Sequence, residues 1–333
     1  VNTHLLDRIA AQTNAASQYV LPSEDIELKV SSFFARVRDP VLSNVTLRVS
    51  GDGVRVAKLQ PAALPDLFSG DVVTVFGRYT GSGPATITIA GTFNGAPHEF
   101  SANVVFPAQA AGADYIPRMW ATRRVGWLLD QVRLHGESAE LRDEVTTLAR
   151  TFGIVTPYTA YLVLEDENAR GVPEALRSFQ ELEKDQSAAQ GARDRLDSVR
   201  KEATTETSRS GAAAVANAQA VQGLESAITV PQAAPAPGLA KSEPAAGSGY
   251  RAAQEQNYAQ QVQVVNGRAF YQNGSTWTDS TAQAQKGLAR RSLRFASPEY
   301  FSFLAQNPSV APWLALGWNI DLVVGGMLVS IRE

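Results

Sequence analysis

The segment ITIAGTFNGAPHEFSANVVF, residues 87–106, carries the clearest indication of fold in this sequence. Ile87 and Ile89 alternate with threonine, and Glu99–Phe106 is a second run that suits a strand. Asn94-Gly95 lies between the two runs. Such a dipeptide is the strongest short hairpin signal, because both central residues of a type I′ turn need a positive φ. The segment therefore predicts two antiparallel strands joined by a tight turn.

Runs on the N-terminal side of this hairpin extend it to a sheet. Alternating apolar residues predict strands at 26–30, 45–49 and 54–56, and the continuously apolar run Val72–Tyr79 predicts a central strand. A strand spacing of about 8–12 residues is typical of a sandwich. The expected fold class is therefore α+β, mainly β, with an antiparallel β-sandwich as its best-defined unit.

After Pro117 the apolar period changes from that of a strand to that of a helix. Apolar residues between 121 and 132 fall on one helical face, and those between 141 and 152 do so again before Gly153. The two stretches predict a helical hairpin. The β-branched and aromatic run Tyr158–Leu164 predicts a strand after it.

The two ends of the chain have a different character. Leu5, Leu6 and Ile9 predict a short helix, which must pack on something because an isolated helix of this length is unstable. A polar helix is expected from Pro173. Residues 203–250 are too rich in Ala, Gln, Ser, Gly and Pro to bury a core, so they predict a low-complexity linker that is disordered or weakly helical.

The last part, 256–333, predicts a small α+β module. Asn266-Gly267 and Gly325-Gly326 mark hairpins, and Ser297-Pro298 marks a helix start. The expected division is thus 1–22, 23–166, 167–255 and 256–333.

Composition limits the possible functions. The chain has 333 residues, a formal net charge of -3 and no cysteine. The charge balance argues against a nucleic-acid binder. The sequence contains no apolar run of about 18 residues, the length that would suggest a membrane span. Without cysteine there are no disulfides and no thiolate nucleophiles or metal ligands. The chain opens at Val1 with no signal segment, so we expect a fragment or a processed product.

Motifs of catalysis are missing from the sequence. There is no G-x-S-x-G elbow, and Gly81-Ser82-Gly83 is followed by a predicted strand rather than the helix that a phosphate loop needs. His135-Gly136-Glu137 has the H-x-E spacing of zinc deaminases, which also need cysteines. We expect His135 to be a helix-end residue and the protein not to be an enzyme; a hydrolase that uses His135 and Glu137 is the alternative.

Arg123 and Arg124 are adjacent on a predicted helix. They point about 100° apart, so both cannot face the core. We expect a structural ion pair with Asp130, Glu137 or Asp143, in preference to an anion-binding site. Arg123, Arg124, His135 and Glu137 are therefore candidate ion-pair or interface residues, and no catalytic, cofactor or metal residue is expected.

Several longer strings resemble one known family. LLDRIA (5–10) and YVLP (19–22) look like the last helix and exit of a von Willebrand factor A domain. LPDLFSG (64–70), WATRRVG (120–126) and GIVTPYT (153–159), with Gly77-Arg78-Tyr79 and LHGE (134–137), resemble the region after that domain in inter-alpha-trypsin inhibitor heavy chains and their bacterial VIT/VWA relatives. The resemblance covers about residues 1–166.

The resemblance implies a support role. The family's divalent-cation site is built around D-x-S-x-S in the A domain, and that motif is absent from this chain, so no cofactor is expected here. The implied function is a non-catalytic scaffold for cation-dependent adhesion or protein assembly, with a protein or polysaccharide ligand bound by an A domain missing from this chain. The implied location is secreted, periplasmic or at the cell surface. A protease-inhibitor-complex component, or a scaffold for a peptidase partner, is the alternative.

Overall fold

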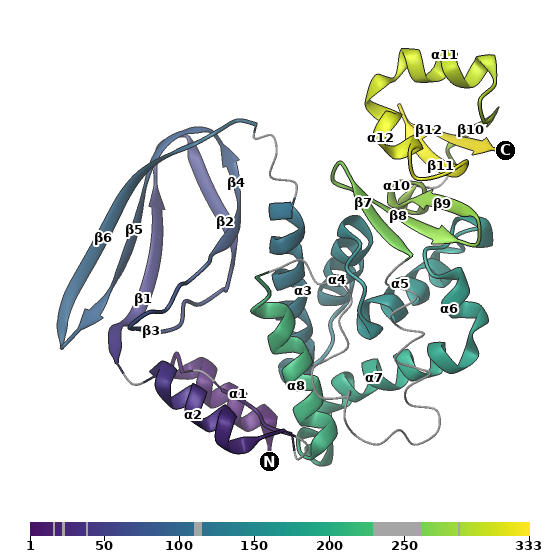
Figure 1. The fold of residues 1–333 in the computed structure, drawn as a ribbon. Coiled ribbons are helices and arrows are strands. Elements are labelled where there is room, and N and C mark those ends of the chain that lie inside the picture. Colours follow the sequence, from purple (N-terminus) through teal and green to yellow (C-terminus); the bar gives the residue numbers. More distant parts are fainter. Residues whose placement is uncertain (16, 22–23, 38, 110–114, 229–260, 286) are drawn as a thin grey trace. The chain divides into compact units, whose positions relative to one another are not determined.

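A computed structural model describes residues 1–333 apart from 16, 22–23, 38, 110–114, 229–260 and 286 (Figure 1). It is 47% helical and 28% strand, and its sheets are largely antiparallel. The mixed class is confirmed, but helix outweighs strand, so the expected predominance of β structure is not found. The boundaries of the four predicted parts stay a prediction.

The chain divides into two compact units. Among the described residues, unit 1 consists of 1–137 and 198–228, and unit 2 consists of 138–197 and 261–333. No helix in the described part of the chain is long and apolar enough to cross a membrane.

Unit 1 contains a four-stranded antiparallel sheet in the order β3-β1-β5-β6 and a two-stranded sheet of β2 and β4. The strands are β1 (Pro40–Ser50), β2 (Val54–Gln60), β3 (Leu67–Phe68), β4 (Phe76–Gly81), β5 (Gly83–Phe93) and β6 (Ala96–Phe106). The predicted hairpin is confirmed, because Asn94 (φ 49°) and Gly95 (φ 79°) join β5 to β6. Antiparallel pairing is thus established, whereas a sandwich is not.

Two strand predictions in this unit are wrong. Residues 26–30 belong to a helix, α2 (Ile26–Val37), which begins where Asp25 Oδ1 accepts the backbone N–H groups of Glu27 and Leu28. Within five residues the apolar positions fit a strand period, and the helical period shows only over the longer run. Val72–Tyr79 is not a central strand either, because the strand begins at Phe76 and Val72 is 89% exposed.

The helices of unit 1 are α1 (Thr3–Gln12), α2, α3 (Tyr115–His135) and α8 (Ala212–Glu225), with the end of α7 (Gln186–Thr204) and the 3₁₀ turn η2 (Glu206–Arg209). α8 lies alongside α3 (Figure 1). Gly126 allows this close approach, since a Cβ there would lie 2.8 Å from Leu224 Cβ. α8 corrects the linker prediction for this stretch, because its small alanine side chains pack closely; residues 229–250 lie outside the described residues.

Unit 2 combines helices with a six-stranded mixed sheet in the order β10-β12-β11-β9-β8-β7. The strands are β7 (Val262–Val265), β8 (Arg268–Asn273), β9 (Thr276–Asp279), β10 (Ala289–Arg294), β11 (Asn319–Val324) and β12 (Met327–Arg332). The helices are α4 (Ala139–Phe152), α5 (Pro157–Arg170), η1 (Glu174–Leu176), α6 (Gln180–Lys184), the first part of α7, α10 (Ser280–Ala284), α11 (Pro298–Gln306), η3 (Pro308–Val310) and α12 (Ala311–Leu314). Both predicted hairpins and the helix capped by Ser297 are confirmed.

The predicted strand Tyr158–Leu164 is wrong, because these residues lie in α5. Thr156 caps the helix, Pro157 occupies its first turn, and Thr156 and Thr159 bond reciprocally with 3.1 and 2.8 Å between side-chain oxygen and backbone nitrogen. These start signals override the β propensity of the residues that follow. The two helices predicted before it are confirmed as α3 and α4, and their packing as a hairpin stays a prediction.

Candidate functional site: a buried ion-pair cluster in unit 1

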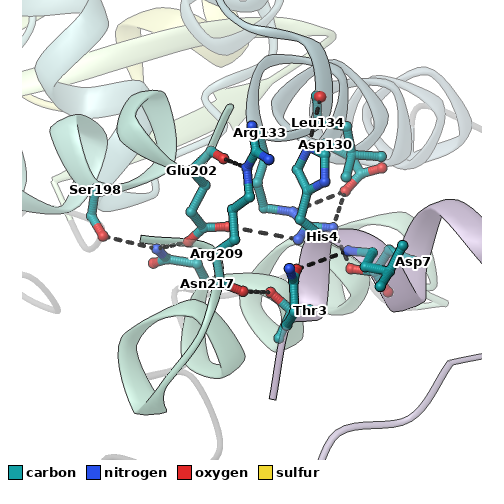
Figure 2. Close-up of polar contacts among 12 residues, drawn as sticks. Thr3, His4, Asp7, Asp130, Arg133, Leu134, Ser198, Glu202, Arg209 and Asn217 are labelled. Carbon is teal, nitrogen blue, oxygen red and sulfur yellow. Dashed lines mark hydrogen bonds and ion pairs between the residues drawn. The ribbon is translucent and has the colours of Figure 1, made fainter. Parts of the chain in front are cut away.

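Unit 1 buries a cluster of charged side chains. Arg133 on α3, only 1% exposed, lies among three carboxylates that come from α1, α3 and α7 (Figure 2). It pairs with Asp7, its Nη2 lies 2.8 Å from Asp130 Oδ1, and its Nη1 lies 3.6 Å from Glu202 Oε2. We refer to Asp7, Asp130, Arg133 and Glu202 as the Arg133 cluster. Its members span nearly 200 positions, so the cluster joins distant segments.

Helical spacing places the residues that α3 and α1 contribute to the cluster on one face of each helix. Asp130 and Arg133 are three residues apart on α3, which places them on one face. On α1, Thr3, His4 and Asp7 form the buried face, with His4 Nε2 2.9 Å from the carbonyl oxygen of Leu134. A carbonyl oxygen only accepts, so Nε2 carries the proton. Burial lowers the pKa of His4, which favours this neutral ring.

The segment after α1 closes one edge of the cluster. The Tyr19 hydroxyl lies 2.7 Å from Asp7 Oδ1 and 2.9 Å from the carbonyl oxygen of Thr3, and Ser17 donates to the same carboxylate oxygen at 2.6 Å. Burial and the neighbouring Asp7 carboxylate raise the pKa of Tyr19. Tyr19 therefore acts as a neutral donor that fixes Asp7 toward Arg133.

Glu202 is fully buried, and only one of its two carboxylate oxygens accepts a hydrogen bond from a described residue. Its Oε1 accepts from Asn217 Nδ2 at 2.6 Å, which ties α7 to α8. Its Oε2 and Arg133 Nη1 have no hydrogen-bond partner among the described residues. The contact between these two atoms is thus coulombic rather than a hydrogen bond, and it is the weakest of the contacts that Arg133 makes in the cluster.

Carboxylates outnumber the cation at this centre. Glu225 on α8 is influenced by Asp130, Arg133 and Asp7 and adds a fourth acidic group. Burial raises the pKa of Glu202 to about 7 and that of Glu225 to about 8, and burial also raises the pKa of Asp130. The charge of the cluster therefore changes near neutral pH.

The structure places Arg123 elsewhere. This side chain is buried, donates from Nε to the carbonyl of Ala227 at 2.9 Å and from Nη1 to that of Thr74 at 2.6 Å, and lies over the ring of Phe76. Burial lowers its pKa. The expected Arg123–carboxylate pair is therefore wrong: Arg123 caps backbone carbonyls instead. Arg124 stacks on Trp127, with 4.3 Å between the guanidinium carbon and the ring centroid.

His135 and Glu137 do not come together as a reactive pair. His135 is exposed in the last turn of α3, where a cation is favoured by the helix dipole. Glu137 forms a two-pronged ion pair with Arg200, with 3.2 Å between Nη2 and Oε1. Within the described residues, no group of three or more His, Asp or Glu side chains could hold a metal ion.

The sequence reasoning missed the Arg133 cluster. The Asp130–Arg133 spacing on a predicted helix was a usable signal, because charges three residues apart meet on one face. Asp7 and Glu202 carried no such signal, since they meet Arg133 only through tertiary packing.

An open hollow of about 670 Å³ lies beside the β1–β2 turn of unit 1. Ser50, Asp52, Thr86 and Asn103 provide its polar lining, and Asp52 is the only titratable residue among those that form it. The hollow is separate in sequence and chemistry from the Arg133 cluster.

Comparison with known proteins finds distant relatives. The chain is 23% identical over 180 residues to inter-alpha-trypsin inhibitor heavy chain H3 of Mesocricetus auratus, 22% over 186 residues to heavy chain H4 of Homo sapiens, and 24% over 201 residues to heavy chain 4 of Mus musculus. These matches cover 50%, 50% and 55% of the chain, but only 20%, 19% and 20% of the relatives. No family model matches, and no solved structure matches significantly. The chain is thus distantly similar to these heavy chains and spans about a fifth of their length.

Proposed function

We propose that this chain is a non-catalytic scaffold and interaction region of a VIT/VWA-type protein. The distant similarity to inter-alpha-trypsin inhibitor heavy chains supports the class. In this proposal the chain supports an A domain of the same polypeptide, and that domain supplies the divalent cation and binds a protein or polysaccharide ligand. The location that goes with this role is secreted, periplasmic or at the cell surface.

The observation that carries the proposal is that α1 docks on unit 1 by its polar face and exposes its apolar face, an arrangement that we call inverted docking. This helix faces unit 1 with Thr3, His4 and Asp7, whereas Leu5, Leu6 and Ile9 are 53%, 42% and 49% exposed. An amphipathic helix normally buries its apolar stripe. Here the Arg133 cluster holds the polar face, and the apolar face is left exposed as a surface of the kind that receives another domain.

Burial of the charged groups supports a structural role. Arg133, Glu202 and Asp7 are each less than a tenth exposed, so a substrate has no access to them in the folded unit. Removing one partner from a buried ion pair is strongly destabilising, so a buried pair between two helices holds them together. The residues of the Arg133 cluster are therefore better suited to fixing α1 than to performing chemistry.

The experiment uses the polypeptide with its A domain and compares its Mg²⁺-dependent ligand binding with that of the present chain. The proposal expects cation-dependent binding from the longer protein, lost in EDTA, and none from this chain alone. Leu6→Glu with Ile9→Glu should weaken that binding, and Val105→Glu, at a more exposed apolar position on β6, should not. Equal, cation-independent binding by this chain alone would overturn the support role.

The names of the relatives favour one alternative, a component of a protease-inhibitor complex. Titration of the chain against a panel of serine proteases tests it. Stoichiometric inhibition or stable complex formation would support this alternative, and unchanged protease activity would leave the scaffold role as the better account.

A further inference from the structure

The six-stranded sheet of unit 2 ends in an open edge at β10. This strand pairs with β12 in parallel, from Ala289 opposite Met327 to Arg294 opposite Arg332, and no strand of the described chain pairs with its other side. Five of its six residues are exposed, and only Leu293 is buried. An edge strand presents backbone N–H and C=O groups that can pair with another chain.

The exposed residues of this edge are basic. Arg290, Arg291 and Arg294 have no carboxylate within ion-pair distance among the described residues. Other arginines of the same sheet do: Arg268 lies 2.6 Å from Asp279, and Arg332 lies 2.8 Å from Asp321. Among the described residues, Arg268 and Arg332 therefore have carboxylate partners within the sheet, whereas the arginines along its edge have none.

The alternation of side chains along β10 places them on two opposite faces of the sheet. Leu293 faces the core under α11, and Arg291 on the same face lies 6.0 Å from the ring centroid of Phe303. Arg290 and Arg294 point to the opposite face, four residues or about 13 Å apart. An added strand with carboxylates at every second position matches this arrangement, because cross-strand pairs of opposite charge attract.

Aromatic side chains lie beside the end of β10. Phe301 is 57% exposed and Trp318 is 60% exposed. Phe295, which directly follows β10, lies 6.5 Å from Trp318 and 5.2 Å from Tyr300 between ring centroids. Charged residues on an edge strand protect against aggregation, and this ordinary role accounts for the arginines. It does not account for the exposed rings of Trp318, which contacts Phe295 at the end of β10, and of Phe301, which contacts Tyr300.

We propose that β10 is a docking strand for an extended acidic segment of a partner protein, which adds to the sheet edge, pairs with Arg290 and Arg294, and rests an apolar residue on Phe301 and Trp318. Strand addition supplies affinity through backbone hydrogen bonds, and side chains supply selectivity. This site lies in unit 2 and does not depend on the role proposed for α1.

The test is calorimetric titration of the whole chain with an eight-residue peptide of alternating glutamate and valine, flanked by phenylalanine. Binding should weaken with salt and quench Trp318 fluorescence, a change that Trp318→Phe removes. Arg290→Ser with Arg294→Ser should weaken binding roughly fivefold, as expected for two exposed charge pairs. Arg48→Ser with Arg55→Ser removes two exposed strand arginines from unit 1 and should change nothing.

Peptide chemistry separates strand addition from simple charge attraction without altering the protein. A version N-methylated at every residue keeps every carboxylate but has no backbone N–H group to donate to β10, and it should not bind. The unmodified peptide should slow hydrogen exchange at residues 290–294. Equal binding of the methylated peptide, no loss in the double arginine variant, or preference for a sulfated oligosaccharide over the peptide would each overturn the proposal.

Discussion

Asp7 and Arg133 form a buried ion pair although 126 positions separate them in the sequence. The pair joins α1 to α3, and the contacts of Arg133 with Asp130 and Glu202 extend the joint to α7. One guanidinium thus contacts carboxylates from three helices. The stability of unit 1 should depend on it more than on any exposed charge.

Arg133→Met removes this cation and leaves its acidic neighbours buried without it. We expect a loss of about 3–5 kcal/mol in the free energy of unfolding, the usual cost of breaking a buried pair. Urea denaturation followed by circular dichroism measures it. Arg48→Met, an exposed arginine on β1, should change stability by less than about 0.5 kcal/mol. Equal stability of the two variants would show that Arg133 does not hold these helices together.

The pKa values of Glu202 and Glu225 predict a loss of stability as pH rises. Both groups titrate near 4.5 when unfolded, and burial raises their pKa to about 7 and about 8 in the folded chain. Between these limits the folded state binds more protons than the unfolded state. The stability they contribute is therefore complete below pH about 4.5 and is lost as pH rises through about 7 and 8.

Comparison with Glu202→Gln/Glu225→Gln isolates this effect. Denaturation at pH 5, 7 and 9 should show a smaller decline in the double variant than in the wild type. His4 acts in the opposite direction below pH about 6.5, because burial lowers its pKa, and it contributes equally to both proteins. Glu99→Gln, at an exposed position of β6, should leave the pH profile unchanged. Parallel profiles for all three proteins would contradict the assignment.

The inverted docking of α1 predicts an unusual pattern of substitution effects. Leu5→Ser and Ile9→Ser should change the stability of the chain by less than about 0.5 kcal/mol, because both side chains are exposed. Asp7→Ala, in contrast, leaves Arg133 with an unmatched donor and should cost about 3 kcal/mol. Thermal unfolding of the three variants checks this order, and the reverse order would mean that α1 docks by its apolar face.

The sequence predicted best where local chemistry determines the backbone. Asn94-Gly95 and Asn266-Gly267 adopt the positive φ angles that their hairpins require, and Ser297 caps the helix that it was expected to begin. These signals act within a few residues, so neighbouring packing does not change them.

Predictions that relied on short apolar patterns were less reliable. Ile26–Val30 fits both a strand period and part of a longer helical period, and the cap at Asp25 decides for the helix. In α1 the helix was predicted from Leu5, Leu6 and Ile9, but the sequence did not indicate that its polar face docks on unit 1, because Asp7 gains a partner that only tertiary structure supplies. The β10 edge was not singled out, since its exposure follows from the strand order.

Two glycines at the ends of neighbouring helices offer a matched comparison. Gly153 ends α4 and Gly171 ends α5, with φ of 61° and 63°. A Cβ at Gly171 would meet nothing within 4 Å, so Gly171→Ala should cost only the left-handed backbone penalty of roughly 1–2 kcal/mol. A Cβ at Gly153 would lie 2.6 Å from Val262 Cγ1, so Gly153→Ala should cost about 1–3 kcal/mol more. Val262→Ala should recover part of that difference in the double variant, as measured by urea denaturation, because the removed methyl group is the clashing one. Equal losses at the two glycines would show that β7 does not pack against the end of α4.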